Sequence, residues 1–251
     1  MVRETLLAAI VAGLIAALVF TVVQSLWVTP LILQGEVYED TAEDTAAHAH
    51  EGHLEGHELE GHEEAHAAAG HHHDESDWKP EDGLQRTLFT FGANLLMGVG
   101  YALVLVALYL LWREPRNALD GAVFGFAGFL VFFVAPCLGL PPELPGTAAA
   151  ELAVRQQWWA MTAAATAVGL FLLFSQNQWW MRVLGIAIVI VPHLVAAPQP
   201  AVESSAAPAE LQSQFRVATT VCNGIFWVAL GVASGIAFRK WVVGGSRHAQ
   251  A

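Results

Sequence analysis

The stretch Thr5-Leu-Leu-Ala-Ala-Ile-Val-Ala-Gly-Leu-Ile-Ala-Ala-Leu-Val-Phe-Thr-Val-Val-Gln-Ser-Leu-Trp-Val28 decides the fold class of this 251-residue chain. Inside it, only Thr21, Gln24 and Ser25 interrupt the apolar run. An α-helix rises about 1.5 Å per residue, so the stretch is long enough to cross a hydrocarbon core of about 30 Å. We expect a retained transmembrane helix rather than a signal peptide, because the apolar core is too long and no convincing cleavage site follows it.

Composition places the whole chain among integral membrane proteins. Apolar residues make up 55% of the sequence, charged residues make up 14%, and the mean hydropathy is +0.47. These values lie outside the usual range of globular domains. The net charge of −12 is unevenly spread, because residues 36–82 hold 16 of the 23 acidic residues and one of the 11 basic residues. The remainder is slightly positive and carries no basic footprint typical of nucleic-acid binding.

Further apolar segments predict an all-α, polytopic protein with about six transmembrane helices. The predicted first helix covers residues 1–33, and an extracytoplasmic acidic His-rich loop covers residues 34–83. Residues 84–241 hold five further predicted helices, at 84–112, 119–140, 158–174, 181–197 and 215–238. Residues 242–251 form a predicted cytoplasmic tail. The fourth and fifth helices are short, so five spans are the alternative. In the first helix, small residues at Ala9, Gly13 and Ala17 predict the close approach of another helix.

A stretch rich in histidine and glutamate follows the first apolar segment. It contains nine of the eleven histidines, which are His48, His50, His53, His57, His62, His66, His71, His72 and His73. Neutral imidazole and carboxylate groups are ligands for divalent cations such as Zn, Ni and Co. Glycines precede several of these histidines and keep the backbone mobile, so we expect a disordered loop that binds metal weakly at several sites. The alternative is an acidic, solvated loop in which the histidines have no ligand role.

The distribution of lysine and arginine predicts the orientation in the membrane. With the N-terminus in the cytoplasm, seven basic residues lie inside (Arg3, Arg113, Arg116, Arg182, Arg239, Lys240 and Arg247) and four outside (Lys79, Arg86, Arg155 and Arg216). The opposite orientation inverts this ratio. The positive-inside rule therefore favours both termini in the cytoplasm, with the His-rich loop outside. In a bacterium, this side is the periplasmic or outer face of the inner (plasma) membrane.

In this orientation the polar side chains of the spans gather in the outer half of the membrane. They are Gln24, Asn94, Cys137, His193, Thr219, Thr220, Cys222 and Asn223. Polar groups inside a bilayer are costly unless they are paired or wetted, so they are functional candidates. His193 follows Pro192, which frees a backbone carbonyl, although an interfacial histidine at a frayed helix end is the alternative. Amide side chains can instead join helices by hydrogen bonds, and a buried cysteine commonly packs as a small apolar residue.

Several short motifs together indicate a family. They are Pro30 with Glu36-Val-Tyr-Glu39, the turn from Ala135-Pro136 to Pro145-Gly146, Arg155-Gln-Gln-Trp-Trp159, and Pro192-His193 with Pro198. Over nearly its whole length, the chain resembles the CbtA family of predicted cobalt transporter subunits. The resemblance implies a multi-span bacterial inner-membrane protein that imports cobalt for cobalamin synthesis. It also implies a small single-span partner subunit with histidines of its own.

These patterns predict a subunit for divalent-cation uptake that has no enzymatic activity and no bound cofactor. The His-rich loop would concentrate metal, and an outer mouth of Glu36, Cys137, Glu143 and His193 would admit it. The resemblance favours Co²⁺, whereas ligand chemistry alone leaves Ni²⁺ and Zn²⁺ open. The sequence has no Walker A motif, so ATP would act only through a partner, and self-association of the chain stays open. The alternatives are a membrane enzyme with histidine boxes and a non-conducting, metal-sensing or accessory subunit.

Overall fold

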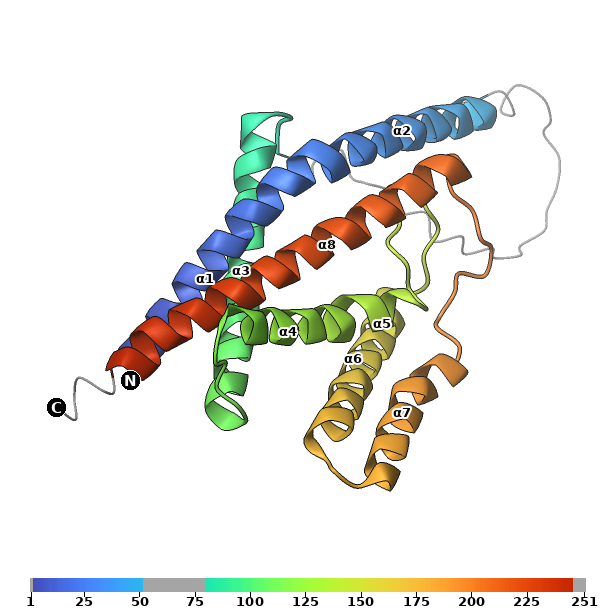
Figure 1. The fold of residues 1–251 in the computed structure, drawn as a ribbon. Helices are drawn as coiled ribbons and strands as arrows, with labels where there is room; N and C mark the ends of the chain where they lie inside the picture. The colour runs from blue at the N-terminus through green and yellow to red at the C-terminus, as the bar shows by residue number, and fades with distance from the viewer. Residues whose placement is uncertain (1, 52–79, 246–251) are drawn as a thin grey trace.

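The computed structural model describes residues 2–51 and 80–245, and most of these residues are helical (Figure 1). One continuous helix begins the chain and comprises α1 (Val2–Val23), the π-helical turn η1 (Gln24–Val28) and α2 (Thr29–Glu51). The other elements are α3 (Leu84–Leu111), α4 (Ala118–Phe129), η2 (Leu130–Val134), α5 (Ala135–Cys137), α6 (Leu152–Ser175), α7 (Trp179–Leu194), α8 (Ala209–Ala237) and η3 (Phe238–Val243). In the part of the chain that the structure describes, the only β-type pairing is an isolated bridge between Thr147 and Ser205, which confirms the all-α prediction.

Five described helices are long and apolar enough to cross a membrane: Val2–Thr45, Leu84–Leu111, Ala118–Cys137, Leu152–Ser175 and Ala209–Val243. The sixth apolar helix, α7, has 16 residues and is therefore roughly 24 Å long, shorter than a typical hydrocarbon core. The predicted polytopic helical protein is confirmed, with five long spans and one short helix. The fourth span is longer than expected, because α6 begins at Leu152 rather than at 158.

The bundle has two ends, because successive helices run in opposite directions. We name the end that holds Val2 and Val243 the terminal end, and the α3–α4 and α6–α7 turns lie there too (Figure 1). We name the other end the loop end. It holds α2, the start of α3 and the two connections at residues 138–151 and 195–208 (Figure 1).

The stripe of small residues on α1 packs against α3, as the sequence predicts. A Cβ atom added at Gly13 would lie 2.6 Å from the Cα of Val99, and one added at Gly98 would lie 2.8 Å from the carbonyl oxygen of Gly13. Ala9 and Ala17 are fully buried on the same side of α1. The two backbones therefore touch at a point where only glycine fits, a packing mode typical of helices in lipid.

A second glycine contact joins α4 to α8. A Cβ atom at Gly121 would lie 2.4 Å from the carbonyl oxygen of Gly231, and one at Gly125 would lie 2.2 Å from the carbonyl oxygen of Trp227. Aromatic rings fill the adjoining space between α3, η2 and α8. The ring centroid of Tyr101 lies 4.6 Å from that of Trp227, and Phe132 stacks on Trp227 at 5.5 Å. Close backbone contact and aromatic packing thus hold the centre of the bundle together.

Two of the π-helical turns end two residues before a proline. The ring of Pro30 would clash with a carbonyl four residues earlier in a regular α-helix, and proline has no N–H to donate. In η1 the N–H of Thr29 donates instead to the carbonyl of Gln24, five residues earlier, and η2 has the same wider turn before Pro136. A π-type turn accommodates the proline without ending the helix.

The first helix consequently extends well beyond its predicted end. It runs to Glu51, through residues 34–51 that were predicted from the sequence to belong to the loop. Residues 36–51 contain neither glycine nor proline and are rich in alanine and glutamate, both good helix formers. The acidic start of the predicted loop is therefore a helix that projects from the loop end (Figure 1).

Candidate functional site

At the loop end, α2 packs against the proline-rich connection of residues 138–151. A Cβ atom at Gly35 would lie 3.2 Å from a methyl group of Leu144. Gly146 has a φ of +71°, which favours glycine, and an added Cβ there would lie 3.2 Å from the Cβ of Glu39. The N–H of Ala206 donates to the carbonyl of Gly146 at 3.0 Å, which ties in the second connection. The proline-rich connection is therefore an ordered turn held between α2 and residues 195–208.

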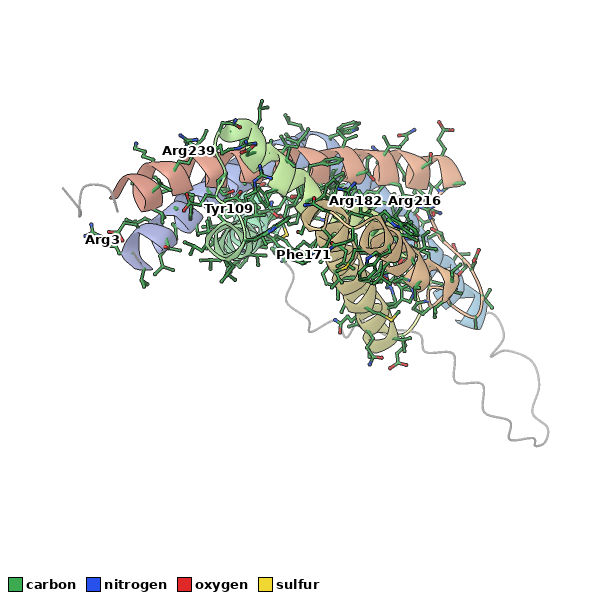
Figure 2. All side chains as sticks on the ribbon, turned by 60° about the horizontal axis from the view of Figure 1, so that its bottom comes forward. Arg3, Tyr109, Phe171, Arg182, Arg216 and Arg239 are labelled. Atoms are coloured by element: carbon green, nitrogen blue, oxygen red, sulfur yellow. The ribbon has the colours of Figure 1, made fainter. Side chains whose placement is uncertain are left out.

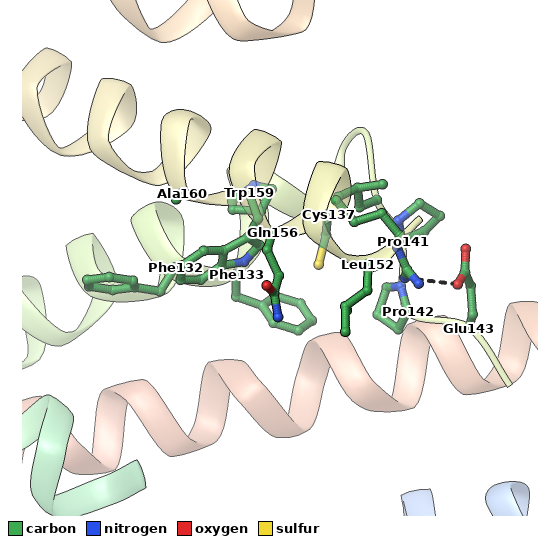
Figure 3. Close-up of a pocket in the computed structure, with 13 residues that line it drawn as sticks. Phe132, Phe133, Cys137, Pro141, Pro142, Glu143, Leu152, Gln156, Trp159 and Ala160 are labelled. Atoms are coloured by element: carbon green, nitrogen blue, oxygen red, sulfur yellow. Dashed lines mark hydrogen bonds and ion pairs between the residues drawn. The ribbon is translucent and has the colours of Figure 1, made fainter. Parts of the chain in front are cut away.

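A groove of about 730 Å³ lies between η2, α5 and α6 and reaches this turn (Figure 3). Aromatic and aliphatic side chains form most of its walls, and a few polar groups enter it. The lining residues are Phe132, Phe133, Pro136, Cys137, Leu140, Pro141, Pro142, Glu143, Leu152, Arg155, Gln156, Trp159 and Ala160. Two predicted metal ligands, Cys137 and Glu143, thus line the same groove.

Glu143 forms an ion pair inside this groove. A terminal guanidinium nitrogen (Nη2) of Arg155 donates to Oε2 of Glu143 at 3.1 Å, shown by the dashed line in Figure 3. The two side chains are only 24% and 29% exposed, so water screens the pair less than it would at an open surface. Arg155 compensates the charge of the carboxylate, and a metal ion at Glu143 would have to compete with it.

Glu36 is paired in a similar way on the other side of the loop end. Arg86 on α3 donates to both carboxylate oxygens of Glu36, at 2.6 and 3.0 Å, and also to Asp82 at 3.0 Å. A bidentate arginine–carboxylate pair is both strong and geometrically specific. It joins α2 to the first turn of α3, so Glu36 has a structural role in addition to its predicted one.

His193 lies apart from the groove. Its ring is 6.0 Å from that of Trp158, edge to face, and the indole N–H of Trp158 donates to the carbonyl of Val195 at 3.2 Å. Among the described residues, no three His, Cys, Asp or Glu side chains are grouped as a metal centre. Residues 36, 137, 143 and 193 are therefore spread over the loop end, and their role as metal ligands stays a prediction.

Most of the predicted His-rich site lies outside the described residues. His48 and His50 belong to the last two turns of α2, whereas the predictions for His53, His57, His62, His66, His71, His72 and His73 fall in residues 52–79. This segment follows the end of α2 and precedes α3, which begins at the loop end. Chain connectivity therefore attaches it on the same side as the groove.

Two intramembrane amides join helices, as one interpretation of the sequence predicts. The side-chain nitrogen of Asn94 donates to the hydroxyl of Thr21 at 3.0 Å and to the amide oxygen of Gln24 at 2.9 Å. Asn94 is only 7% exposed, so these bonds satisfy a donor that lipid could not. Asn223 instead donates to the carbonyl of Thr219 in its own helix, and Cys222 is buried in the apolar core.

Sequence reasoning missed the partners of the two candidate carboxylates. It treated Arg86 and Arg155 only as indicators of orientation, yet each pairs with a predicted ligand. Asp82, four residues before Arg86, was a local signal for an ion pair in the first turn of α3. The pairing of Arg155 with Glu143 depends on the path of the proline-rich turn. The sequence of an irregular turn has no periodic pattern from which this path could be predicted.

Long apolar helices that contact through glycine, with partly buried ion pairs at one end, define a polytopic helical membrane protein. The chain belongs to the family described as "Probable cobalt transporter subunit (CbtA)", which matches residues 2–239. Membership confirms the resemblance and implies transport rather than catalysis, with cobalt as cargo and with a partner subunit. Comparisons with curated proteins and with solved structures find no significant match.

Proposed function

We propose that this chain is the membrane subunit of an uptake system for Co²⁺ in a bacterial inner membrane, and that the cobalt serves cobalamin synthesis. The observation that carries the proposal is the unequal chemistry of the two ends. The loop end holds the groove with Cys137 and Glu143 and the attachment of the His-rich segment. The terminal end holds most of the basic residues.

The basic residues support an orientation with the terminal end in the cytoplasm. Those at the terminal end are Arg3, Arg113, Arg116, Arg182, Arg239 and Lys240. Figure 2 shows Arg3 and Arg239 where α1 begins and α8 ends. Among the described residues, the loop end holds only three basic residues, Arg86, Arg155 and Arg216. Positive residues favour the cytoplasmic side, so in this proposal the His-rich segment meets metal outside the cell.

In the proposed sequence of events, imidazoles and carboxylates of the His-rich segment raise the local metal concentration. The ion then reaches Glu143, whose oxygens are ligands suited to a divalent cation. Arg155 holds this carboxylate in place while no metal is bound and is displaced by the doubly charged ion. Cys137 lines the same groove, and Glu36 and His193 act as further ligands along the loop end.

A second candidate function is an accessory subunit without its own conduction path. It is favoured by the packing of Tyr101, Phe132 and Trp227, whose rings fill the centre of the bundle. In this case a path across the membrane would form with the partner subunit. Transport by the purified chain alone, reconstituted in vesicles, would distinguish conduction from an accessory role.

Accumulation of radiolabelled cobalt by cells tests the proposal. Glu143→Gln removes the charge that attracts metal but keeps the shape of the side chain, and we expect it to lower uptake severalfold. Glu151→Gln is the matched control, because Glu151 is exposed eight residues later and does not line the groove. Equal uptake by the two variants would refute the role of Glu143.

A further inference from the structure

We propose that a pocket at the terminal end, between the α3–α4 turn and η3, binds the phosphate group of an anionic lipid. The pocket has a volume of about 260 Å³ and is lined by Glu114, Pro115, Arg116, Arg239, Val243 and Gly244. It lies at the end of the bundle opposite the groove. The inference rests on the orientation proposed above, but it does not depend on which ion the protein transports.

The position of the pocket matches the depth of lipid headgroups. Three candidate membrane spans begin or end beside it, at Leu111, Ala118 and Val243. Trp112 precedes the α3–α4 turn and Trp241 lies in η3, and tryptophan is enriched where a helix leaves the hydrocarbon core. A ligand in this pocket would therefore be surrounded by headgroups rather than by bulk solvent.

The charges of the pocket suit a phosphate group. Arg116 is fixed by Asp120, with Nε and Oδ2 2.8 Å apart, and this side-chain hydrogen bond raises the pKa of Arg116. Arg239 is exposed, and no carboxylate of residues 2–51 or 80–245 forms an ion pair with it. Glu114 contributes one opposing charge. Guanidinium groups bind phosphate oxygens in a bidentate manner, so Arg239 is the available donor. Arg116, whose charge Asp120 balances, forms the opposite wall.

The wall that the α3–α4 turn forms is held in place before any ligand binds. Pro115 is buried, and its Cβ lies 3.7 Å from the position of a Cβ added at Gly235 of α8. The adjoining Gly121 and Gly231 bring α4 against α8. A preformed site loses less conformational entropy when its ligand binds. Basic pockets between membrane helices on the cytoplasmic side are suited to lipid headgroups.

Native mass spectrometry of the full chain in detergent, titrated with phosphatidylglycerol, tests this site. We expect Arg239→Gln to weaken lipid retention about fivefold, the effect of one basic residue near an anionic surface. Arg182→Gln is the matched control, because Arg182 lies at the same end but donates to the carbonyl of Gln176, away from the pocket. An equal loss in both variants would show general charge attraction and overturn the proposal.

Two further arms separate the site from loss of folding and from binding of free phosphate. Glu114→Gln removes the opposing charge, so we expect stronger lipid retention, a change that a damaged fold would not produce. Excess inorganic phosphate should leave the bound lipid in place, because the acyl chains also contribute to its binding. Weaker retention in Glu114→Gln, or displacement of the lipid by inorganic phosphate, would contradict a lipid site here.

Discussion

Replacing Gly231 with alanine tests the contact between α4 and α8. The new Cβ atom would lie 2.3 Å from the carbonyl oxygen of Gly121 and 2.8 Å from backbone atoms of Gly125. Backbone atoms cannot rotate aside as a flexible side chain can, so the two helices must separate. Overpacking of this kind costs about 1–3 kcal/mol, and we expect the upper half of that range because two contacts are disturbed.

Gly100→Ala is the matched control for this substitution. Gly100 lies within α3, and an added Cβ atom would meet no heavy atom within 4 Å. Alanine is favoured over glycine inside a helix by about 0.5–1 kcal/mol, so this variant should be neutral or slightly more stable.

Unfolding of the purified variants in detergent, followed by tryptophan fluorescence, measures the difference between them. The structure predicts that Gly231→Ala unfolds at a clearly lower temperature than the wild-type protein, and Gly100→Ala at the same or a higher one. A Gly231→Ala protein as stable as Gly100→Ala would refute the close backbone contact between α4 and α8.

Three other predictions concern the polar contacts between helices and the His-rich segment. Asn94→Leu should lower the free energy of unfolding in the same assay by about 1 kcal/mol, because interhelical hydrogen bonds in membranes contribute about 0.6 kcal/mol each. Asn223→Leu, whose amide bonds only within its own helix, should lower it less. Arg86→Gln should speed proteolysis of α2, since it removes the bidentate bond to Glu36; an unchanged digestion rate would argue against this anchor. Deletion of residues 52–73 should raise the cobalt concentration needed for half-maximal uptake while leaving the maximal rate nearly intact, and complete loss of uptake would instead make the segment part of the pathway.

Much of the fold was predictable, because the bilayer imposes simple rules on sequence. Spans had to be long and apolar, and the stripe of small residues at 9, 13 and 17 predicted a close helix contact, which Gly13 makes with α3. The extension of α2 to Glu51 was missed because acidic composition suggested a loop, whereas helix propensity and the π-turn before Pro30 favour continuation.

The candidate site was less predictable, because its contacts depend on how distant helices align. Counting residues along the predicted spans places Gln24 and Asn94 at similar depths in the membrane. Only the crossing of the first helix with α3 shows that the two side chains form a hydrogen bond. The pairing of Glu143 with Arg155 likewise needs the ordered turn between α5 and α6. Sequence placed the candidate carboxylates at one end of the bundle, whereas their arginine partners required the structure, and their role as metal ligands stays a prediction.

Uptake of radiolabelled cobalt tests the central claim most directly. Cells that lack endogenous cobalt import would express this chain with its partner subunit, and control cells would express the partner alone. We predict cobalt accumulation that requires the chain and that competing external Ni²⁺ or Zn²⁺ reduces only partly. Equal accumulation in the presence and absence of the chain would contradict its role in cobalt uptake.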